Sequence, residues 1–257
     1  MLPGGLGSLS KGENLLRALQ FSHKVTIVFA SQPRVMTSGE GRGEGRDYCS
    51  RWDLEATAKL VNALNAPRIG AMRPEVHISH ARQQDGAGYW AKEIADTRLG
   101  SVVVLGSELM NVAAGAMLGS LFPGETRAPF QVIWPSAQVP KGFLPGRFMR
   151  TGPKRGVVFD GKTFELKENE DFALICACRL KQRTLILVSG MGGPGTFAGC
   201  QLLGKDGVAQ IANGLTWVGL WRVPFRVSPG HAHGGDPRTL STAKPPKLIH
   251  DLTLEHG

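Results

Sequence analysis

Three short polar segments carry the residue types that could do chemistry, and each follows a stretch that predicts a strand. The segments are residues 31–34, 106–111 and 189–196. In α/β proteins ligands bind where parallel strands end, because the loops after those strands meet at one edge of the sheet. We therefore expect these three segments to build one site.

Residues 189–196 are the strongest candidate, because an apolar strand is followed by four glycines, a threonine and then a predicted helix. Such a loop presents backbone N–H groups and a helix N-terminus to an anion. The residues predicted to bind a ligand here are Ser189, Gly190, Gly192, Gly193, Gly195 and Thr196. Thr196 is also a suitable helix N-cap. The alternative is a tight turn that needs glycine only for close packing.

The run Gly-Gly-Pro-Gly-Thr in this loop resembles the phosphate-binding Gly-Gly-x-Gly-Thr loop of the lysine-decarboxylase-like (LOG) nucleotide phosphoribohydrolases and their Rossmann-like relatives. The resemblance implies a Rossmann-like fold and a nucleotide ligand. The family has a proline before the first glycine and a glutamate three residues after the threonine, where this chain has Met191 and Gly199. The missing carboxylate favours binding without chemistry. The loop has neither a Walker A ending nor the dinucleotide-binding spacing.

Residues 106–111 contain the candidate catalytic residue, Glu108, and two candidate ligand contacts, Ser107 and Asn111. A carboxylate at a strand end could hold a ribose hydroxyl or act as a general base or nucleophile. The alternative is that Ser107 caps the next helix and Glu108 stabilises the positive end of its dipole.

Residues 31–51 form a long predicted loop whose Arg34 and Arg46 are candidate ligand contacts. Guanidinium groups suit phosphate and carboxylate, so the loop could close over an anionic ligand. The alternative is a solvated loop, because acidic residues between the arginines partly cancel their charge.

The elements that position these segments are predicted from short apolar runs and from helical spacing of apolar residues. Strands are expected at residues 24–31, 75–79, 101–105, 130–134, 172–179 and 183–189, and helices at 52–65, 86–97, 112–121 and 197–203. Asp160 and Gly161 predict a hairpin turn. Pro224 predicts that the strand at 217–227 lies at an edge of its sheet.

Alternating strands and helices predict an α/β fold, a Rossmann-like three-layer sandwich with a mostly parallel sheet. We expect an N-terminal arm at residues 1–22, the α/β domain at 23–227 with a connector or flap at 135–155, and a flexible C-terminal tail at 228–257 unless the tail docks.

Composition excludes several classes of protein. The chain has 257 residues, of which 42% are hydrophobic, and its 34 glycines follow no regular period, which excludes collagen and long coiled coils. Four scattered cysteines argue against a disulfide scaffold, and no secretory signal is evident, so we expect a reducing, cytoplasmic location. Residues 101–122 are long enough to span a membrane, but Glu108 and Asn111 lie near their centre, and a strand, a turn and a helix are expected instead.

We expect an anionic small molecule, most simply a nucleotide, as the partner. The net charge of +9 is spread over loops and tail rather than concentrated in a nucleic-acid-binding motif, which makes nucleic acid the weaker candidate. His77 with His80, and His231 with His233, lack the further ligands of a metal site, and no cofactor is expected. No membrane partner is expected, and homo-oligomerisation is left open.

The function expected from these observations is ligand sensing or regulation through nucleotide binding. One alternative is an enzyme that cleaves or transfers a nucleotide N-glycosidic bond with Glu108 as its catalytic carboxylate. A second alternative is a structural subunit of a larger assembly, because every glycine of residues 189–196 also suits a turn.

Overall fold

A computed structural model gives the structure of the chain. It describes residues 14–33, 47–66, 73–108, 110–123, 128–134, 149–151, 155–181, 183–205, 213–227, 238–241 and 244–255. Arg34, Arg46 and most of the loop that carries them lie outside the described residues, as do His231 and His233.

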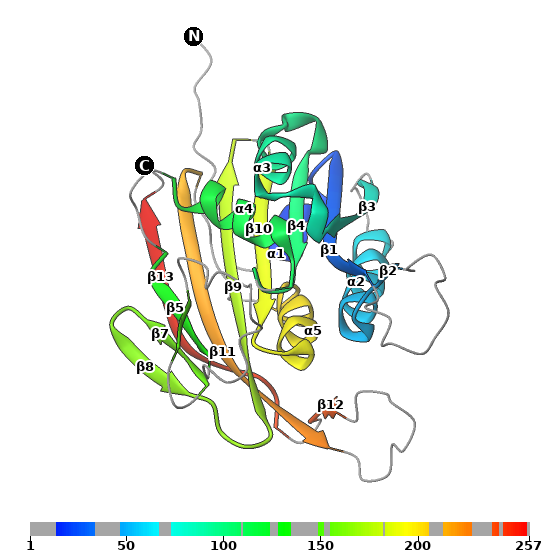
Figure 1. Cartoon of the computed structure of the whole chain (residues 1–257). Helices are drawn as coiled ribbons and strands as arrows, with labels where there is room; N and C mark the ends of the chain where they lie inside the picture. Colours follow the sequence, from blue (N-terminus) through cyan, green and yellow to red (C-terminus); the bar gives the residue numbers. More distant parts are fainter. Residues whose placement is uncertain are drawn as a thin grey trace.

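Within the described residues a nine-stranded sheet forms the centre of the molecule, in the order β12-β11-β9-β10-β4-β1-β2, with β3 also beside β1 and β13 beside β11 (Figure 1). Its strands are β1 (Lys24–Pro33), β2 (Asp47–Tyr48), β3 (Glu75–Arg82), β4 (Ser101–Leu105), β9 (Glu170–Leu180), β10 (Arg183–Gly190), β11 (Leu215–Val227), β12 (Arg238–Leu240) and β13 (Lys247–Glu255).

Half of this sheet is parallel. Strand β1 pairs in parallel with both β3 and β4, and β4 pairs in parallel with β10, so that Val104 lies between Val28 and Leu187. All five residues of β4 are buried, as expected for a strand that is covered on both faces.

The other half is antiparallel, which corrects the expectation of a mostly parallel sheet: the sheet is mixed. Strands β9, β11 and β13 each run opposite to their neighbour. The physical reason lies in the link between β9 and β10, where Arg183 already pairs with Leu180 and Lys181 has a φ of 49°. So short a link joins only antiparallel strands, because a parallel pair needs a long crossover.

Helices pack on both faces of the sheet (Figure 1). The helices are α1 (Leu15–Gln20), α2 (Arg51–Asn65), α3 (Ala87–Ala95), α4 (Val112–Leu121) and α5 (Gly193–Leu202), with short 3-10 turns η1 (Gln83–Asp85) and η2 (Thr97–Leu99). Helices α1, α2 and α5 share one core with Val103 and Leu105. Helices α3 and α4 share the other core with Val102 and Val104. Alternate residues of β4 thus face opposite cores.

A second sheet of four strands has the order β6-β5-β7-β8. Its strands are β5 (Phe130–Trp134), β6 (Met149–Thr151), β7 (Gly156–Phe159) and β8 (Lys162–Glu165). Asp160 and Gly161, with φ of 48° and 71°, form the predicted turn between β7 and β8. Phe130, Val157 and Phe159 extend the core of α3 and α4.

Strand β11 is an interior strand, so the expectation that Pro224 marks an edge was wrong. Pro224 lies opposite Glu170 of β9. On its other side the partner of β11 changes from β13, whose first residue lies opposite Arg222, to β12, whose last residue lies opposite Phe225. A proline fits there because it has no N–H to donate, and neither β13 nor β12 pairs with β11 at this residue. Strand β13 also shows that part of the expected tail docks.

Two further expectations from the sequence are confirmed. Residues 101–122 form a strand, a turn and a helix, and no helix in the described part of the chain is long and apolar enough to cross a membrane. Cys49, Cys176, Cys178 and Cys200 are all free thiols. Cys176 and Cys178 are buried on the same side of β9, as their alternation predicts.

Candidate functional site

The loops that follow β4 and β10 lie side by side at one edge of the large sheet. The two strands are in register up to Leu105 and Val188, and the N–H of Gly106 donates to the carbonyl of Val188 (2.9 Å). Residues 106–111 and 189–196 therefore come together as expected. The end of β1 reaches the same edge, because β1 pairs in parallel with β4.

Asn111 fixes the loop after β4. Its Nδ2 donates to the carbonyl of Leu105 (2.7 Å), and its Oδ1 accepts from the N–H of Ala113 (2.9 Å). Helix α4 begins at Val112, so the cap is Asn111 and not Ser107, which corrects the capping alternative. The Asn111 side chain is fully buried, and its amide group makes these two hydrogen bonds to the backbone.

Ser107 and Glu108 lie between this cap and the sheet edge and are half-buried. The Glu108 carboxylate lies over α4, where a Cβ added at Gly115 would be 3.9 Å from Glu108 Oε2. The small residue at position 115 thus leaves room for the carboxylate. Of the three residues predicted in this loop, Ser107 and Glu108 are half-buried, and Oε1 of the Glu108 carboxylate is itself buried.

The glycine loop, residues 189–196, holds a carboxylate of its own chain. The N–H of Gly195 donates to Oδ2 of Asp171 (2.8 Å), and the N–H of Gly192 lies 3.1 Å from both carboxylate oxygens. The N–H of Phe172 also donates to Oδ1 of Asp171 (2.8 Å). Asp171, near the start of β9, therefore occupies the position that an anion takes at the N-terminus of a helix.

Two further N–H groups of the glycine loop also have acceptors within the protein. The N–H of Gly190 donates to Oγ1 of Thr196 (3.0 Å), and the N–H of Met191 donates to the carbonyl of Phe172 (3.3 Å). Thr196 lies inside α5, whose N-cap is Gly192, so the expectation that Thr196 is the cap was wrong. Its hydroxyl instead closes the turn.

Close packing explains why glycine is required at two of these positions. A Cβ at Gly193 would lie 2.0 Å from Cδ1 of Trp52, and a Cβ at Gly195 would lie 2.1 Å from the carbonyl oxygen of Phe172. Real Cβ atoms do not approach other atoms so closely, so helix α5 packs on α2 and β9 only with glycine there.

Burial raises the pKa of Asp171, and hydrogen bonds from the loop together with the charge of Arg238 oppose the rise. Arg238 belongs to β12, and a Cβ at Gly192 would be 2.9 Å from its Nη1 and 3.0 Å from Oδ2 of Asp171. The carboxylate is thus enclosed by the loop on one side and faces a guanidinium on the other. Sequence reasoning missed it, although an acidic residue at the start of an apolar run was a usable signal.

Asp53 is a second buried carboxyl group that sequence reasoning missed. It is 7% exposed, and burial raises its pKa from 3.8 to about 7. Its position on α2 belongs to the buried stripe that includes Ala56, Leu60 and Leu64. An acidic residue on an apolar stripe was the signal that could have identified it. A carboxyl group with this pKa can gain or lose a proton near neutral pH.

His77 and His80 contact neighbouring side chains on their own strand, β3. His77 Nε2 lies 2.6 Å from Glu75 Oε1, and His80 accepts from Arg82 Nε at 3.3 Å. In the part of the chain that the structure describes, no group of three histidine, cysteine or acidic side chains could hold a metal ion.

A groove of about 1160 Å³ lies at the opposite end of the parallel strands, where these strands begin. Arg183 in this groove donates from Nη2 to the carbonyl of Ile94 and so satisfies the C-terminal end of α3. Arg98 pairs with Asp96 at 2.6 Å. These cations therefore contribute to the fold.

Comparison of the chain with protein-family models, with curated proteins and with solved structures gives no match.

Proposed function

We propose that the protein binds a phosphorylated small molecule, with a nucleotide as the first candidate, and acts as a sensor. The ligand would lie at the sheet edge where β1, β4 and β10 end. We interpret the parallel half of the sheet, with helices on both faces, as a Rossmann-like three-layer arrangement.

The observation that carries the proposal is the divergence of the chain after β1 and β4. These strands are neighbours in the sheet, yet α2 after β1 packs in one core and α4 after β4 packs in the other. Such a switch opens a crevice at the carboxyl ends of the strands, which is where open α/β sheets bind ligands. Ser107 and Glu108 lie in the loop that directly follows β4.

Gly199 supports binding rather than chemistry. The phosphoribohydrolase loop that residues 192–196 resemble has a glutamate at the corresponding position. Here a Cβ would lie 2.5 Å from Cγ1 of Val188 and 3.6 Å from the Cβ of Ala173, inside the core of α5. A carboxylate in that place would have neither water nor a partner.

An enzyme that acts on a nucleotide N-glycosidic bond is the second candidate. Glu108 is the residue that favours it, because a carboxylate in the loop after β4 suits a general base or a nucleophile. Glu108 would then be the carboxylate at the reacting bond. A purely structural subunit is the third candidate. It would be favoured if the tests of both the sensor and the enzyme failed.

Replacing Glu108 with Gln separates the first two candidates. The sensor predicts that nucleotide affinity is retained, because the anion loses only a repulsive neighbour, and that neither protein releases free base. The enzyme predicts that wild type releases base and that the variant keeps binding but loses turnover. Calorimetric titration gives the affinity, and chromatography of the incubated nucleotide gives the turnover.

A further inference from the structure

A groove of about 470 Å³ lies at the same sheet edge as the glycine loop. Gly190, the last residue of β10, pairs with Ala173 of β9, and β9 begins at Glu170, opposite Pro224 of β11. The charged side chains that line it are Glu168, Glu170, Arg222, Arg226, Lys244 and Lys247. We call it the basic groove, because its lining contains four cations and two carboxylates.

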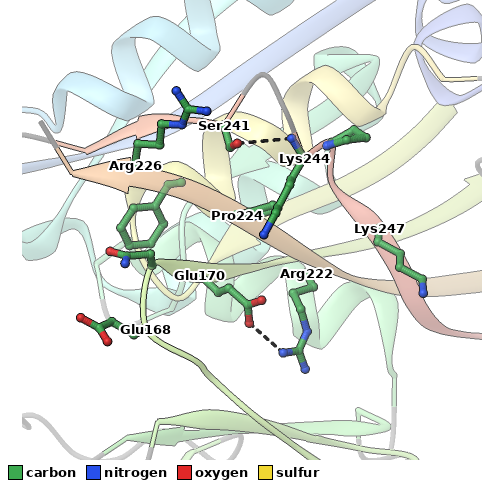
Figure 2. Close-up of a pocket in the computed structure, with 11 residues that line it drawn as sticks. Glu168, Glu170, Arg222, Pro224, Arg226, Ser241, Lys244 and Lys247 are labelled. Carbon is green, nitrogen blue, oxygen red and sulfur yellow. Dashed lines mark hydrogen bonds and ion pairs between the residues drawn. The ribbon is translucent and has the colours of Figure 1, made fainter.

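One ion pair forms a wall of the basic groove. Arg222 Nη1 lies 2.7 Å from Glu170 Oε2 (Figure 2). The Arg222 guanidinium also lies 5.7 Å from the ring centroid of Phe172. This pair cancels its own charge. Arg226, Lys244 and Lys247 make no ion pair within the described residues, and Glu168 is the remaining acidic side chain. The groove therefore has an excess of two positive charges.

The basic groove also has an apolar lining, formed by Pro224 and Phe225. It lies where the partner of β11 changes from β13 to β12, and the N–H of Ser241, directly after β12, donates to the carbonyl of Pro224 (3.1 Å). Ser241 Oγ accepts from the N–H of Lys244 (3.3 Å), and the side chain of Lys244 extends over Pro224 toward the Glu170–Arg222 pair (Figure 2).

We propose that the basic groove receives the phosphate monoester of the ligand. A phosphate monoester carries close to two negative charges at neutral pH, which matches the excess of the groove, and lysine and arginine form charge-assisted hydrogen bonds with its oxygens. The N–H groups of Gly192 and Gly195 are occupied by Asp171, so the phosphate takes its donors from these side chains. This inference rests on the proposed function and names the phosphate-recognition part of the same edge.

The test uses phenyl phosphate, which joins a phosphate monoester to an apolar ring, with phenol as the uncharged control. Both compounds are titrated calorimetrically into the full chain, at low and at high salt. The groove variant is Lys244→Glu/Lys247→Glu. The matched control is Lys59→Glu/Lys162→Glu, which changes the net charge equally at two exposed lysines outside the groove. All four substituted side chains are exposed, and circular dichroism verifies that each variant is folded.

The inference predicts that phenyl phosphate binds wild type and the control, that phenol does not bind, and that the groove variant binds roughly tenfold or more weakly. High salt weakens the binding. If the groove variant binds phenyl phosphate as tightly as wild type while Gly192→Ala loses binding, the phosphate lies in the glycine loop. That result would overturn the basic groove as the phosphate site but leave the proposed function intact. If neither phenyl phosphate nor any nucleotide binds, both the basic groove and the proposed function are overturned.

Discussion

The N–H of Gly195 donates to Oδ2 of Asp171 across 2.8 Å, so the glycine loop that resembles a phosphate-binding loop is filled by a carboxylate of its own chain. The carboxylate anchors the start of α5 to β9, much as an N-cap side chain would, but from a neighbouring strand. The glycine loop is therefore held rigid at the edge where a ligand is proposed to bind.

Replacing Asp171 with Ala removes the acceptor of the buried N–H groups of Phe172 and Gly195 and of the part-buried N–H of Gly192. An unsatisfied buried donor costs about 1–3 kcal/mol, so we expect the free energy of unfolding to fall by at least about 2 kcal/mol. Urea denaturation measures the change, and Glu168→Ala at an exposed position is the control. A loss below that of the control would mean that Asp171 does not anchor the loop.

Replacing Gly193 with Ala is expected to destabilise the protein severely, because the new Cβ would overlap the indole ring of Trp52. Gly88→Ala in α3 is the matched control, since a Cβ there meets nothing within 4 Å. The control should gain about 0.5–1 kcal/mol from helix propensity. Similar melting temperatures for the two variants would contradict the packing of α5 on α2. The overlap also makes substitutions at Gly193 unsuitable as probes of ligand binding.

The pKa of Asp53 predicts a dependence of stability on pH. Its folded pKa of about 7 lies above the ordinary 3.8, so between these values the folded chain holds a proton that the unfolded chain has released. The contribution of Asp53 to the free energy of unfolding therefore falls as pH rises from about 3.8 to about 7, by about 4 kcal/mol in total, and is constant above.

Asp53→Asn removes this effect. The variant should gain stability over wild type as pH rises from acid to neutral, and the difference should level off above pH 7 or so. Thermal melts at matched pH values give the difference, with Glu168→Gln as the exposed control. A difference that does not change with pH would show that Asp53 titrates normally.

Much of the fold could be predicted because local patterns determine it. Residues 101–105 and 112–121 match β4 and α4, since a short run with three consecutive valines favours a strand and a longer run rich in alanine and other small residues favours a helix. The mixed sheet was missed because strand direction depends on connection length, and the short bend near Lys181 was the relevant signal.

The candidate site was predicted only in part, for a different reason. The glycine loop and the segment at Ser107 and Glu108 could be located, because each follows a recognisable strand. Asp171 could not be assigned to the loop from sequence, because it precedes Gly192 by 21 residues and meets it only through the pairing of β9 with β10. The basic groove was missed for the same reason, since Lys244 and Lys247 reach it only through the docking of β13 on β11.

The most direct test of the account is a thermal-shift comparison of phosphorylated compounds with their dephosphorylated counterparts, such as AMP with adenosine and ribose 5-phosphate with ribose, on the full chain. A ligand specific to the folded state adds about 2.7 kcal/mol of apparent stability at a hundred times its dissociation constant. The account predicts that at least one phosphorylated member raises the melting temperature, that its dephosphorylated counterpart does not, and that Lys244→Glu/Lys247→Glu reduces the rise. A cooperative melt that no phosphorylated compound shifts would contradict the central claim.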